Sequence, residues 1–446
     1  MSCEINLEQK IDYKGYWYLP SSPENKIAGV LTYHVGNKIE LALIGCFNSS
    51  TSLLGREEES VIYGKTSDAK DITLFQCYSN SKVNFNAEFP IVKYNCNFII
   101  IGKHINSLEE KAQYWVRFKI PELTYWCHPK ALTYNVKFNN DSKTNQKTIS
   151  FNSTYNNKES IIREVKINNN TTIQIKKGID FESTNMLLNP KLKQYTYIEI
   201  IKQSQSSINE LLSDIRTFEH FISFATLNIV QSTNITFFDK NIFQQCNSEY
   251  YYREIHFICP SSHEKNINTQ KECTNFLFQY STIEDIYPKF IQNWYNVPTD
   301  LFPIRTHLIS SLEKKTTYSS VDFLIIIQAI EGFWWRFRDN AYKAKNSIPK
   351  KQNTYLNTIL TELSNEFNNI ELLNKNKINI VAVVDSRNYY SHFMEQNKKP
   401  NKLKGWPLIE EAKKLRILLI CCFLSFIGLE NIQIDTIFKT NNHNLI

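Results

Sequence analysis

The chain has 446 residues, of which 42% are hydrophobic, and it can bury more than one core because single cores stop growing at roughly 250–300 residues. Glycine (11) and proline (13) are scarce while tyrosine (24) and phenylalanine (28) are plentiful, which excludes a disordered or fibrous chain. The 51 basic and 44 acidic residues give a net charge of +7, which permits an anionic partner without requiring one. We therefore expect a globular protein of two domains.

The apolar segments argue against export and membrane insertion. Residues Met1–Lys10 mix acidic and polar side chains and lack the apolar core of a signal peptide. The longest apolar run, Ile417–Leu429, is shorter than the roughly 20 residues that span a bilayer. We expect a cytoplasmic protein without a membrane partner, in which this run is a buried helix.

The first part of the chain alternates short apolar runs with polar clusters. Branched and aromatic residues at this spacing predict antiparallel strands, and the Asn-rich stretches 139–157 and 168–172 look like hairpin turns or loops. Helical spacing of apolar residues over Ser206–Val230 predicts a helix packed on the sheet. We expect residues 1–280 to form an antiparallel β-rich domain. Its predicted strands include Ile27–His34, Ile39–Phe47, Ile72–Tyr78, Cys96–Ile101, Tyr114–Ile120, Asn234–Asp239 and Glu254–Cys259.

From about Ser281 the pattern becomes helical and stays so. Asn353-Thr354 and Lys398–Gly405 are the expected breaks, the second of which carries a proline and a glycine. Residues 281–446 are therefore predicted to form an all-α helical bundle, which makes the whole chain an α+β protein. The expected helices are Thr282–Tyr295, Val321–Lys345, Tyr355–Phe367, Ile378–Gln396 and Leu408–Leu429.

Two familiar kinds of site can be set aside. Gly64-Lys65-Thr66 resembles the end of a phosphate-binding loop, but Glu59 stands where that motif requires glycine. A zinc site built from Cys246, Cys259, His263 and Cys273 lacks any C-x-x-C pair, so scattered thiols explain these residues better. We assign no metal and no cofactor.

The segment Arg387–His392 (RNYYSH) holds the most informative polar residues. In a helix, Asn388 and His392 lie on one face, and Arg387 lies about 100° from Asn388 around the axis. Arginine keeps its charge and offers a planar fork of donors to phosphate, while histidine exchanges protons near neutral pH. On the residues alone, a solvated surface helix remains the alternative.

This segment resembles the R-x4–6-H motif of HEPN ribonucleases. The stretch with Phe323, Gln328, Ala329 and Glu331 resembles the first long helix of ApeA-like HEPN domains. Short motifs of the first half resemble the ApeA N-terminal domain in order and spacing: Gly15–Pro20, Gly29–Tyr33, Leu43–Gly45, Val61–Gly64 and Ile72–Leu74.

The resemblance implies a metal-independent RNA endonuclease with Arg387 and His392 as its catalytic pair. Asn388 is then expected to hold phosphate or ribose, and Glu331 to orient Arg387 or His392 or to form a structural ion pair. The RNA 2′-hydroxyl would attack, which leaves 2′,3′-cyclic phosphate and 5′-hydroxyl ends. The resemblance also implies a homodimer with a composite cleft, abortive anti-phage defence, a phage-derived trigger sensed by the first domain, and host RNA, with tRNA a candidate, as the substrate.

The surroundings of the motif leave further alternatives open. The loop with Lys398, Lys399, Lys402 and Lys404 is a candidate for RNA backbone contact, or else a solvated loop. Trp334, Trp335 and Phe337 are expected to be core or dimer contacts more than platforms for bases. The rival function, from a different class, is a non-catalytic HEPN scaffold that binds RNA or a partner protein.

Overall fold

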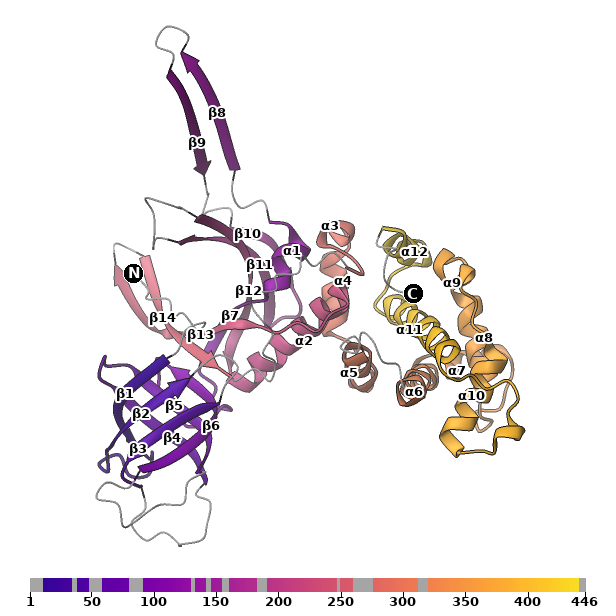
Figure 1. The fold of residues 1–446 in the computed structure, drawn as a ribbon, viewed down its shortest axis with the longest axis horizontal. Helices are drawn as coiled ribbons and strands as arrows, with labels where there is room; N and C mark the ends of the chain where they lie inside the picture. Colours follow the sequence, from indigo (N-terminus) through magenta and orange to yellow (C-terminus); the bar gives the residue numbers. More distant parts are fainter. Residues whose placement is uncertain are drawn as a thin grey trace. The chain divides into compact units, whose positions relative to one another are not determined.

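The computed structural model describes residues 11–33, 38–47, 58–79, 91–129, 133–141, 146–154, 160–182, 191–246, 249–259, 276–311 and 320–440. These residues fall into two compact units (Figure 1). A sheet unit takes the described residues of 1–121, 129–215 and 232–271, and a helical unit takes those of 122–128, 216–231 and 272–446. The chain is thus an antiparallel β-rich region followed by a helical region, as the sequence predicts.

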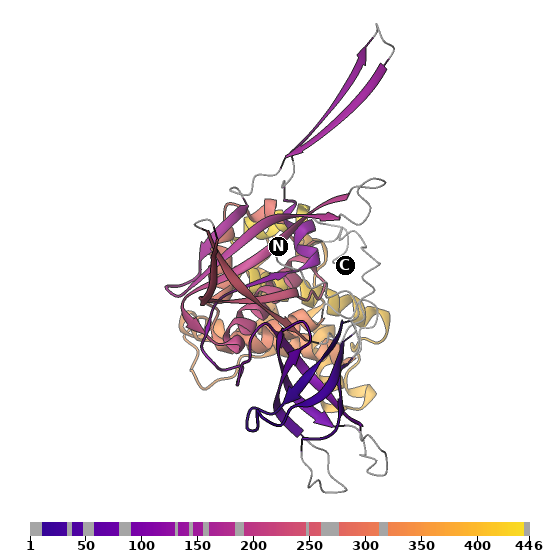
Figure 2. The same ribbon diagram turned by 90° about the vertical axis from the view of Figure 1, so that its left-hand side faces the viewer.

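A closed barrel forms one part of the sheet unit, drawn in indigo to purple in Figures 1 and 2. Its strand order is β6-β3-β2-β1-β4-β5, and β5 pairs back to β6 with every neighbour antiparallel. Inward and outward residues alternate along β2 and β3, which places Leu31, Leu41 and Leu43 in a core around the fully buried Trp17. The strands are β1 Ile11–Tyr18, β2 Ile27–Tyr33, β3 Ile39–Ile44, β4 Glu58–Thr66, β5 Asp71–Ser79 and β6 Ile91–Ile101.

The rest of the large sheet continues from β6 in the order β14-β13-β7-β12-β11-β10. These strands are β7 Gln113–Lys119, β10 Ile161–Lys166, β11 Thr171–Glu182, β12 Lys191–Ser206, β13 Thr233–Cys246 and β14 Glu249–Ile258. A separate hairpin pairs β8 (Thr133–Asp141) with β9 (Gln146–Thr154). The Asn-rich stretch 139–157, expected to be turns or loops, is therefore largely strand, because cross-strand pairing outweighs local composition; 142–145 and 155–157 lie outside the described residues.

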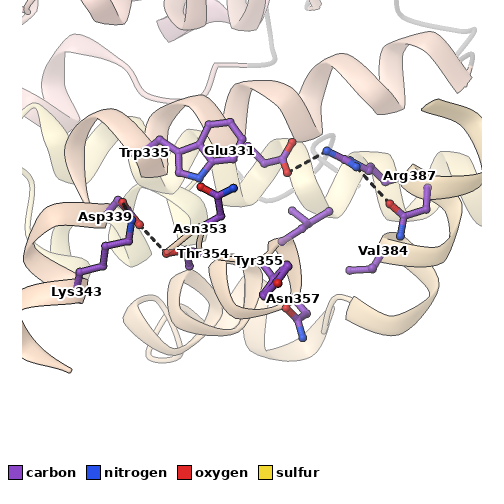
Figure 3. Close-up of a pocket in the computed structure, with 12 residues that line it drawn as sticks. Glu331, Trp335, Asp339, Lys343, Asn353, Thr354, Tyr355, Asn357, Val384 and Arg387 are labelled. Atoms are coloured by element: carbon purple, nitrogen blue, oxygen red, sulfur yellow. Dashed lines mark hydrogen bonds and ion pairs between the residues drawn. The ribbon is translucent and has the colours of Figure 1, made fainter. Parts of the chain in front are cut away.

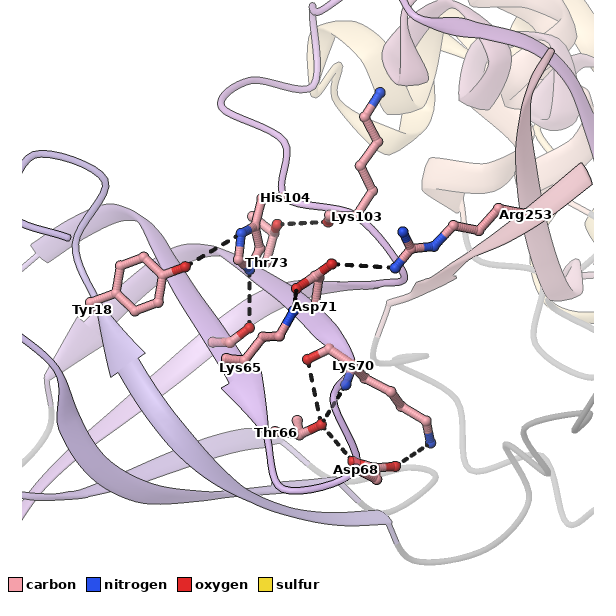
Figure 4. Close-up of polar contacts among 11 residues, drawn as sticks. Tyr18, Lys65, Thr66, Asp68, Lys70, Asp71, Thr73, Lys103, His104 and Arg253 are labelled. Atoms are coloured by element: carbon pink, nitrogen blue, oxygen red, sulfur yellow. Dashed lines mark hydrogen bonds and ion pairs between the residues drawn. The ribbon is translucent and has the colours of Figure 1, made fainter. Parts of the chain in front are cut away.

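Polar contacts join the barrel to β14 (Figure 4). Asp71 of β5 accepts from Lys65 at 2.7 Å and from Arg253 of β14 at 3.3 Å. Burial raises the pKa of Asp71, but these hydrogen bonds and nearby positive charge outweigh it and lower the pKa below its usual value. Gly64 faces the Trp17 ring, which an added Cβ would meet at 2.3 Å. The Gly64-Lys65-Thr66 stretch thus belongs to barrel packing.

Helix α2 (Ile208–Thr226) begins with a reciprocal cap, in which Ser207 Oγ accepts from Glu210 N at 3.1 Å and Glu210 Oε2 accepts from Ser207 N at 3.0 Å. Its first half belongs to the sheet unit, where Asp214 pairs with Lys202 of β12 at 2.7 Å. Its second half belongs to the helical unit. The predicted helix at Ser206–Val230 is confirmed.

An aromatic core holds the first helices of the helical unit together. Phe221 of α2 contacts the rings of Trp126 (5.7 Å between centroids), Phe290 (5.6 Å) and Trp294 (5.6 Å). Indole nitrogens are satisfied by backbone: Trp126 donates to the Phe278 carbonyl at 2.8 Å and Trp294 to the Thr217 carbonyl at 3.0 Å. The helices concerned are α1 (Pro121–Cys127), α3 (Tyr280–Ile283) and α4 (Tyr287–Tyr295).

Helix α11 (Trp406–Phe426) runs through the centre of the helical unit. Each of its residues from Ile417 to Leu424 is at most 1% exposed, which confirms the predicted buried helix. Phe426 packs against Phe333 and Phe337 of α6. Over the described residues, no helix has the length and apolar character needed to span a bilayer. The remaining helices are α5 Phe302–Ser311, α6 Ser320–Phe337, α7 Asp339–Lys345, α8 Leu356–Glu366, α9 Glu371–Lys375, α10 Ile380–His392 and α12 Asn431–Thr440.

Three predicted helices have different limits in the structure. The predicted Thr282–Tyr295 helix is divided into α3 and α4. The predicted Val321–Lys345 helix breaks at Arg338, whose guanidinium pairs with Glu366 of α8 at 2.9 Å, while Asp339 accepts from Trp334 and Thr354. Tertiary contacts therefore override local helix propensity there. The predicted Ile378–Gln396 helix begins at Ile380 and ends at His392. Helices α1, α5, α9 and α12 were not predicted.

Candidate active site

Helix α10 carries the polar segment and is fixed at both ends. Its N-cap Asn379 accepts from Ala382 N at 3.1 Å and donates its own N–H to Glu411 Oε2 of α11 at 3.1 Å. Phe393 adopts a left-handed conformation (φ 48°), which ends the helix directly after His392. His392 therefore occupies the last turn of the helix and is exposed to solvent.

The guanidinium of Arg387 contacts the three other residues expected at the site. Its Nη1 donates to Asn388 Oδ1 at 3.2 Å and lies 3.5 Å from His392 Nε2. Its Nη2 donates to Glu331 Oε1 of α6 at 3.4 Å (Figure 3). Because arginine has no acceptor, the contact with His392 is a hydrogen bond only for the tautomer whose Nε2 is unprotonated. The structure thus brings the four expected residues together from two helices.

Glu331 and Arg387 differ in exposure. The Glu331 side chain is 7% exposed and that of Arg387 is 29% exposed, so the carboxylate is buried while its cationic partner reaches solvent. A buried carboxylate is costly without a partner, whereas the guanidinium has N–H groups left over for a further acceptor. The contact between Glu331 and Arg387 fits both roles expected of Glu331, which are to orient the arginine and to form a structural ion pair.

The lysine loop after α10 is tied to the helix. Leu403 N donates to Oγ of the fully buried Ser386 at 2.8 Å, Tyr390 OH donates to the Leu403 carbonyl at 2.9 Å, and Asn401 donates to Asp385 at 3.1 Å. Burial of the Tyr390 hydroxyl raises its pKa. At 100° per residue, Asp385 lies about 160° from Arg387 around the helix axis, Ser386 about 100° and Tyr390 about 60°.

The four lysines of this loop are not equivalent. Lys398 pairs with Glu395 at 3.6 Å and Lys399 with Asp385 at 3.4 Å. The ammonium groups of Lys402 and Lys404 lie 5.3 and 5.7 Å from the centre of the Tyr389 ring. The loop therefore brings two cations to the ring of Tyr389, which lies about 160° from Arg387 around the axis of α10.

The sequence did not identify a cavity of about 790 Å³ next to Arg387 and Asn388 (Figure 3). Its lining includes residues 353–357, for which the sequence indicated only a helix break. Trp334 is core, as expected, but Trp335 is 51% exposed and lines this cavity. No signal in the local sequence marks these residues, because only the packing of α6, α8 and α10 brings them together.

Among the residues that the structure describes, no group of three or more His, Cys, Asp or Glu side chains is arranged to hold a metal ion. His263 and Cys273 of the zinc set lie outside those residues.

Comparison with known families places this helical site in a class. The Apea-like HEPN model matches residues 324–433, a span that contains Glu331, Arg387, His392 and the lysine loop. The ApeA N-terminal domain 1 model matches residues 12–294, more than half of the chain. No curated protein and no solved structure matches it significantly.

Residues 324–433 of the helical region are therefore a HEPN domain. The chain as a whole belongs to the ApeA family, with the ApeA N-terminal domain preceding an ApeA-like HEPN domain. Membership of this family supports a nuclease role in anti-phage defence. The boundary that we expect after residue 280 stays a prediction.

Proposed function

We propose that the protein is a metal-independent RNA endonuclease of the HEPN type that cleaves host RNA, with tRNA a candidate substrate, in abortive anti-phage defence. The observation that carries the proposal is the placement of one guanidinium, that of Arg387, within 3.2–3.5 Å of Asn388, His392 and Glu331. A fixed positive charge beside a proton-exchanging imidazole is the set of groups that phosphodiester cleavage by an internal nucleophile needs.

The reaction proceeds through the RNA's own 2′-hydroxyl. A base removes the 2′-proton, the oxygen attacks the phosphorus, and an acid protonates the departing 5′-oxygen. The products are a 2′,3′-cyclic phosphate and a 5′-hydroxyl. His392 carries the proton transfer, a role worth about 10²–10⁴ in rate. Arg387 stabilises the negative charge that develops on the phosphorane.

The contacts of Arg387 also assign roles to its neighbours. The Asn388 carbonyl accepts from Arg387, so its amide NH₂ remains to donate to a phosphate or ribose oxygen. Glu331 holds Arg387 from the buried side, which fixes the direction of the donor fork.

In-line cleavage supports a composite cleft. The base and the acid act on opposite sides of the phosphorus, whereas the motif supplies one histidine in each chain. Two protomers that pack their α10 helices together would provide both groups. The enzyme is therefore proposed to be a homodimer through the HEPN domain, with Lys402 and Lys404 binding the RNA backbone and the sheet unit sensing a phage-derived trigger.

The chemistry of the RNA ends tests this proposal. The activated protein is expected to cut RNA in excess EDTA and to leave 2′,3′-cyclic phosphate and 5′-hydroxyl ends, read by end-specific ligation and sequencing. Cleavage that stops on chelation and returns with magnesium, or that leaves 5′-phosphate ends, would overturn the metal-independent mechanism. RNA binding without cleavage would favour the scaffold alternative.

A further inference from the structure

The cavity beside the catalytic segment has the size of a ligand site. It holds about 790 Å³, within the roughly 300–1,000 Å³ typical of pockets that enclose small molecules. Its walls come from α6, α7, the residues that lead into α8, and α10. On α10 it is lined by Val384, Arg387 and Asn388, so it extends from the motif toward the helix N-terminus, away from His392.

The charged groups that line this cavity neutralise one another. Glu331 pairs with Arg387 at 3.4 Å, and Asp339 pairs with Lys343 at 2.6 Å. Asp339 also accepts a hydrogen bond from Thr354 at 2.6 Å. Burial raises the pKa of Asp339, but its hydrogen bonds outweigh burial and lower the pKa below its usual value. Away from Arg387, the lining therefore offers no unpaired charge to a phosphate and suits an uncharged group.

Two exposed aromatic rings enter the cavity from different elements (Figure 3). Trp335 of α6 is 51% exposed and Tyr355, which precedes α8, is 73% exposed. Two rings that line one cavity offer an apolar surface that a flat group can cover. A stacked nucleobase is such a group, and stacking tolerates any base.

Carboxamides supply the polar part of the lining. Asn353 is exposed and lines the cavity beside Tyr355, and Asn388 lines it at the edge nearest the catalytic arginine. A carboxamide presents one donor and one acceptor side by side, which matches the edge of a base. Aromatic faces and amides around a neutral cavity are the features of base recognition.

We propose that this cavity is a nucleobase subsite, which takes the base of the nucleotide next to the scissile phosphate of single-stranded RNA. Tyr355 and Trp335 stack on the base and Asn353 reads its edge. The subsite rests on the proposed nuclease function and adds sequence preference to it. Since Arg387 faces both the cavity and His392, a nucleotide in the subsite has its phosphate at the motif.

Binding of uniform RNAs tests the subsite separately from catalysis. The full chain with His392→Asn, which is expected not to cut the probe, is titrated into labelled single-stranded oligo-A, oligo-C or oligo-U, and Kd is read by fluorescence anisotropy. One homopolymer is expected to bind more tightly than the others. Tyr355→Ala should weaken that binding by roughly five-fold to 100-fold and Tyr355→Phe should restore it, because stacking needs only the ring.

Matched variants show whether the loss of RNA affinity is specific to the aromatic residues of the cavity or follows from removing any exposed aromatic residue. Trp335→Ala should act like Tyr355→Ala, whereas Trp406→Ala, an exposed tryptophan (64%) outside the cavity lining, should leave all three affinities unchanged. Asn353→Ala should reduce the difference between homopolymers more than it reduces the tightest affinity.

Three results would overturn the subsite. One is an unchanged affinity for every homopolymer in Tyr355→Ala and Trp335→Ala. Another is a shift from dimer to monomer in these variants by light scattering, which would make the rings subunit contacts. The third is competition by the free mononucleotide as strong as that by the oligomer, which would mean that a soluble nucleotide is the occupant. None of these results bears on the proposed nuclease function, which is tested separately by RNA cleavage, by its dependence on His392 and by the chemistry of the RNA ends.

Discussion

Arg387 is attached to the protein interior as well as to the catalytic segment. Its guanidinium is the charged partner of Glu331, whose side chain is 7% exposed. Removing the arginine would leave that carboxylate buried without a cation, which destabilises a protein more than the loss of a surface contact. Catalytic and structural effects of Arg387 therefore have to be separated by the choice of variant.

Arg387→Lys and Arg387→Ala make that separation. Lysine keeps the positive charge near Glu331 but loses the planar fork, so we expect little change in stability and at least about a ten-fold loss of RNA cleavage. Alanine should also lower the free energy of unfolding by about 1–3 kcal/mol. Chemical denaturation and cleavage rates measure the two effects.

The control for these variants is Arg336→Ala, at an exposed arginine of α6, where both quantities should stay near wild type, within about 0.5 kcal/mol for stability. Full cleavage by Arg387→Lys would show that a point charge is sufficient and that the fork has no role.

Residues of the site differ in how far the sequence reveals them. Arg387, Asn388 and His392 lie within one helical turn and a half, so their proximity follows from helix geometry. Glu331 was suggested by family resemblance, and its contact with Arg387 needed the packing of α6 on α10. Tyr355 and Asn353 carry no local signal, because their role comes only from a cavity between helices.

At the scale of elements, the end of α10 is strained. Phe393 has φ 48° and is 94% exposed, although a side chain in the left-handed region costs about 1–2 kcal/mol relative to the right-handed one. The residue directly after His392 therefore fixes where the helix stops at some cost in stability.

Phe393→Gly should relieve this strain. Glycine adopts positive φ freely but gains freedom in the unfolded chain, so the net gain in unfolding free energy should be about 0.5–1 kcal/mol. Thermal unfolding measures it, and Phe393→Asn, which also tolerates the left-handed region, should change stability in the same direction. A fall in stability for both would mean that the exposed ring makes a stabilising contact.

The sequence predicts helices and strands well where their apolar residues follow a single regular pattern. Alternating strands such as β2 and β3, and the apolar α11, were predicted within a few residues. Helix α5 was missed because its apolar residues do not form one stripe, and α9 is too short to show a period. The break at Arg338 depends on partners in α8 and near Thr354, which no local pattern reveals.

At the scale of the whole molecule, the two compact units interleave along the chain. Residues 122–128 and 216–231 pack with the helical unit, although they lie between segments of the sheet unit. The sequence predicts the order of a β-rich and a helical region, but it does not show that α2 is shared, because both halves of α2 have the same helical spacing.

Exposed apolar side chains of the HEPN domain predict where two copies of the chain meet. We expect the HEPN domain to associate through the faces of α6 and α10, where Val321 (59% exposed) and Val381 (63%) leave apolar side chains in solvent. Val381→Asp should give monomers by light scattering and abolish cleavage. Aspartate is acceptable to the first turn of a helix, so α10 itself should persist.

Ile432→Asp is the matched control, since Ile432 is the second residue of α12, as Val381 is of α10, and is 77% exposed. It should leave mass and cleavage unchanged. A wild-type protein that is active as a strict monomer would remove the composite cleft.

The most direct measurement of the central claim compares His392→Asn with His128→Asn in cells in which the protein has been triggered, by sequencing the RNA ends. His128 is an exposed histidine of the helical unit at positive φ, which asparagine tolerates, and its contact is with Gln279 at 3.2 Å. We predict that wild type and His128→Asn generate new RNA ends with 2′,3′-cyclic phosphate and that His392→Asn, folded and dimeric, generates none. Equal cleavage by His392→Asn would contradict the account.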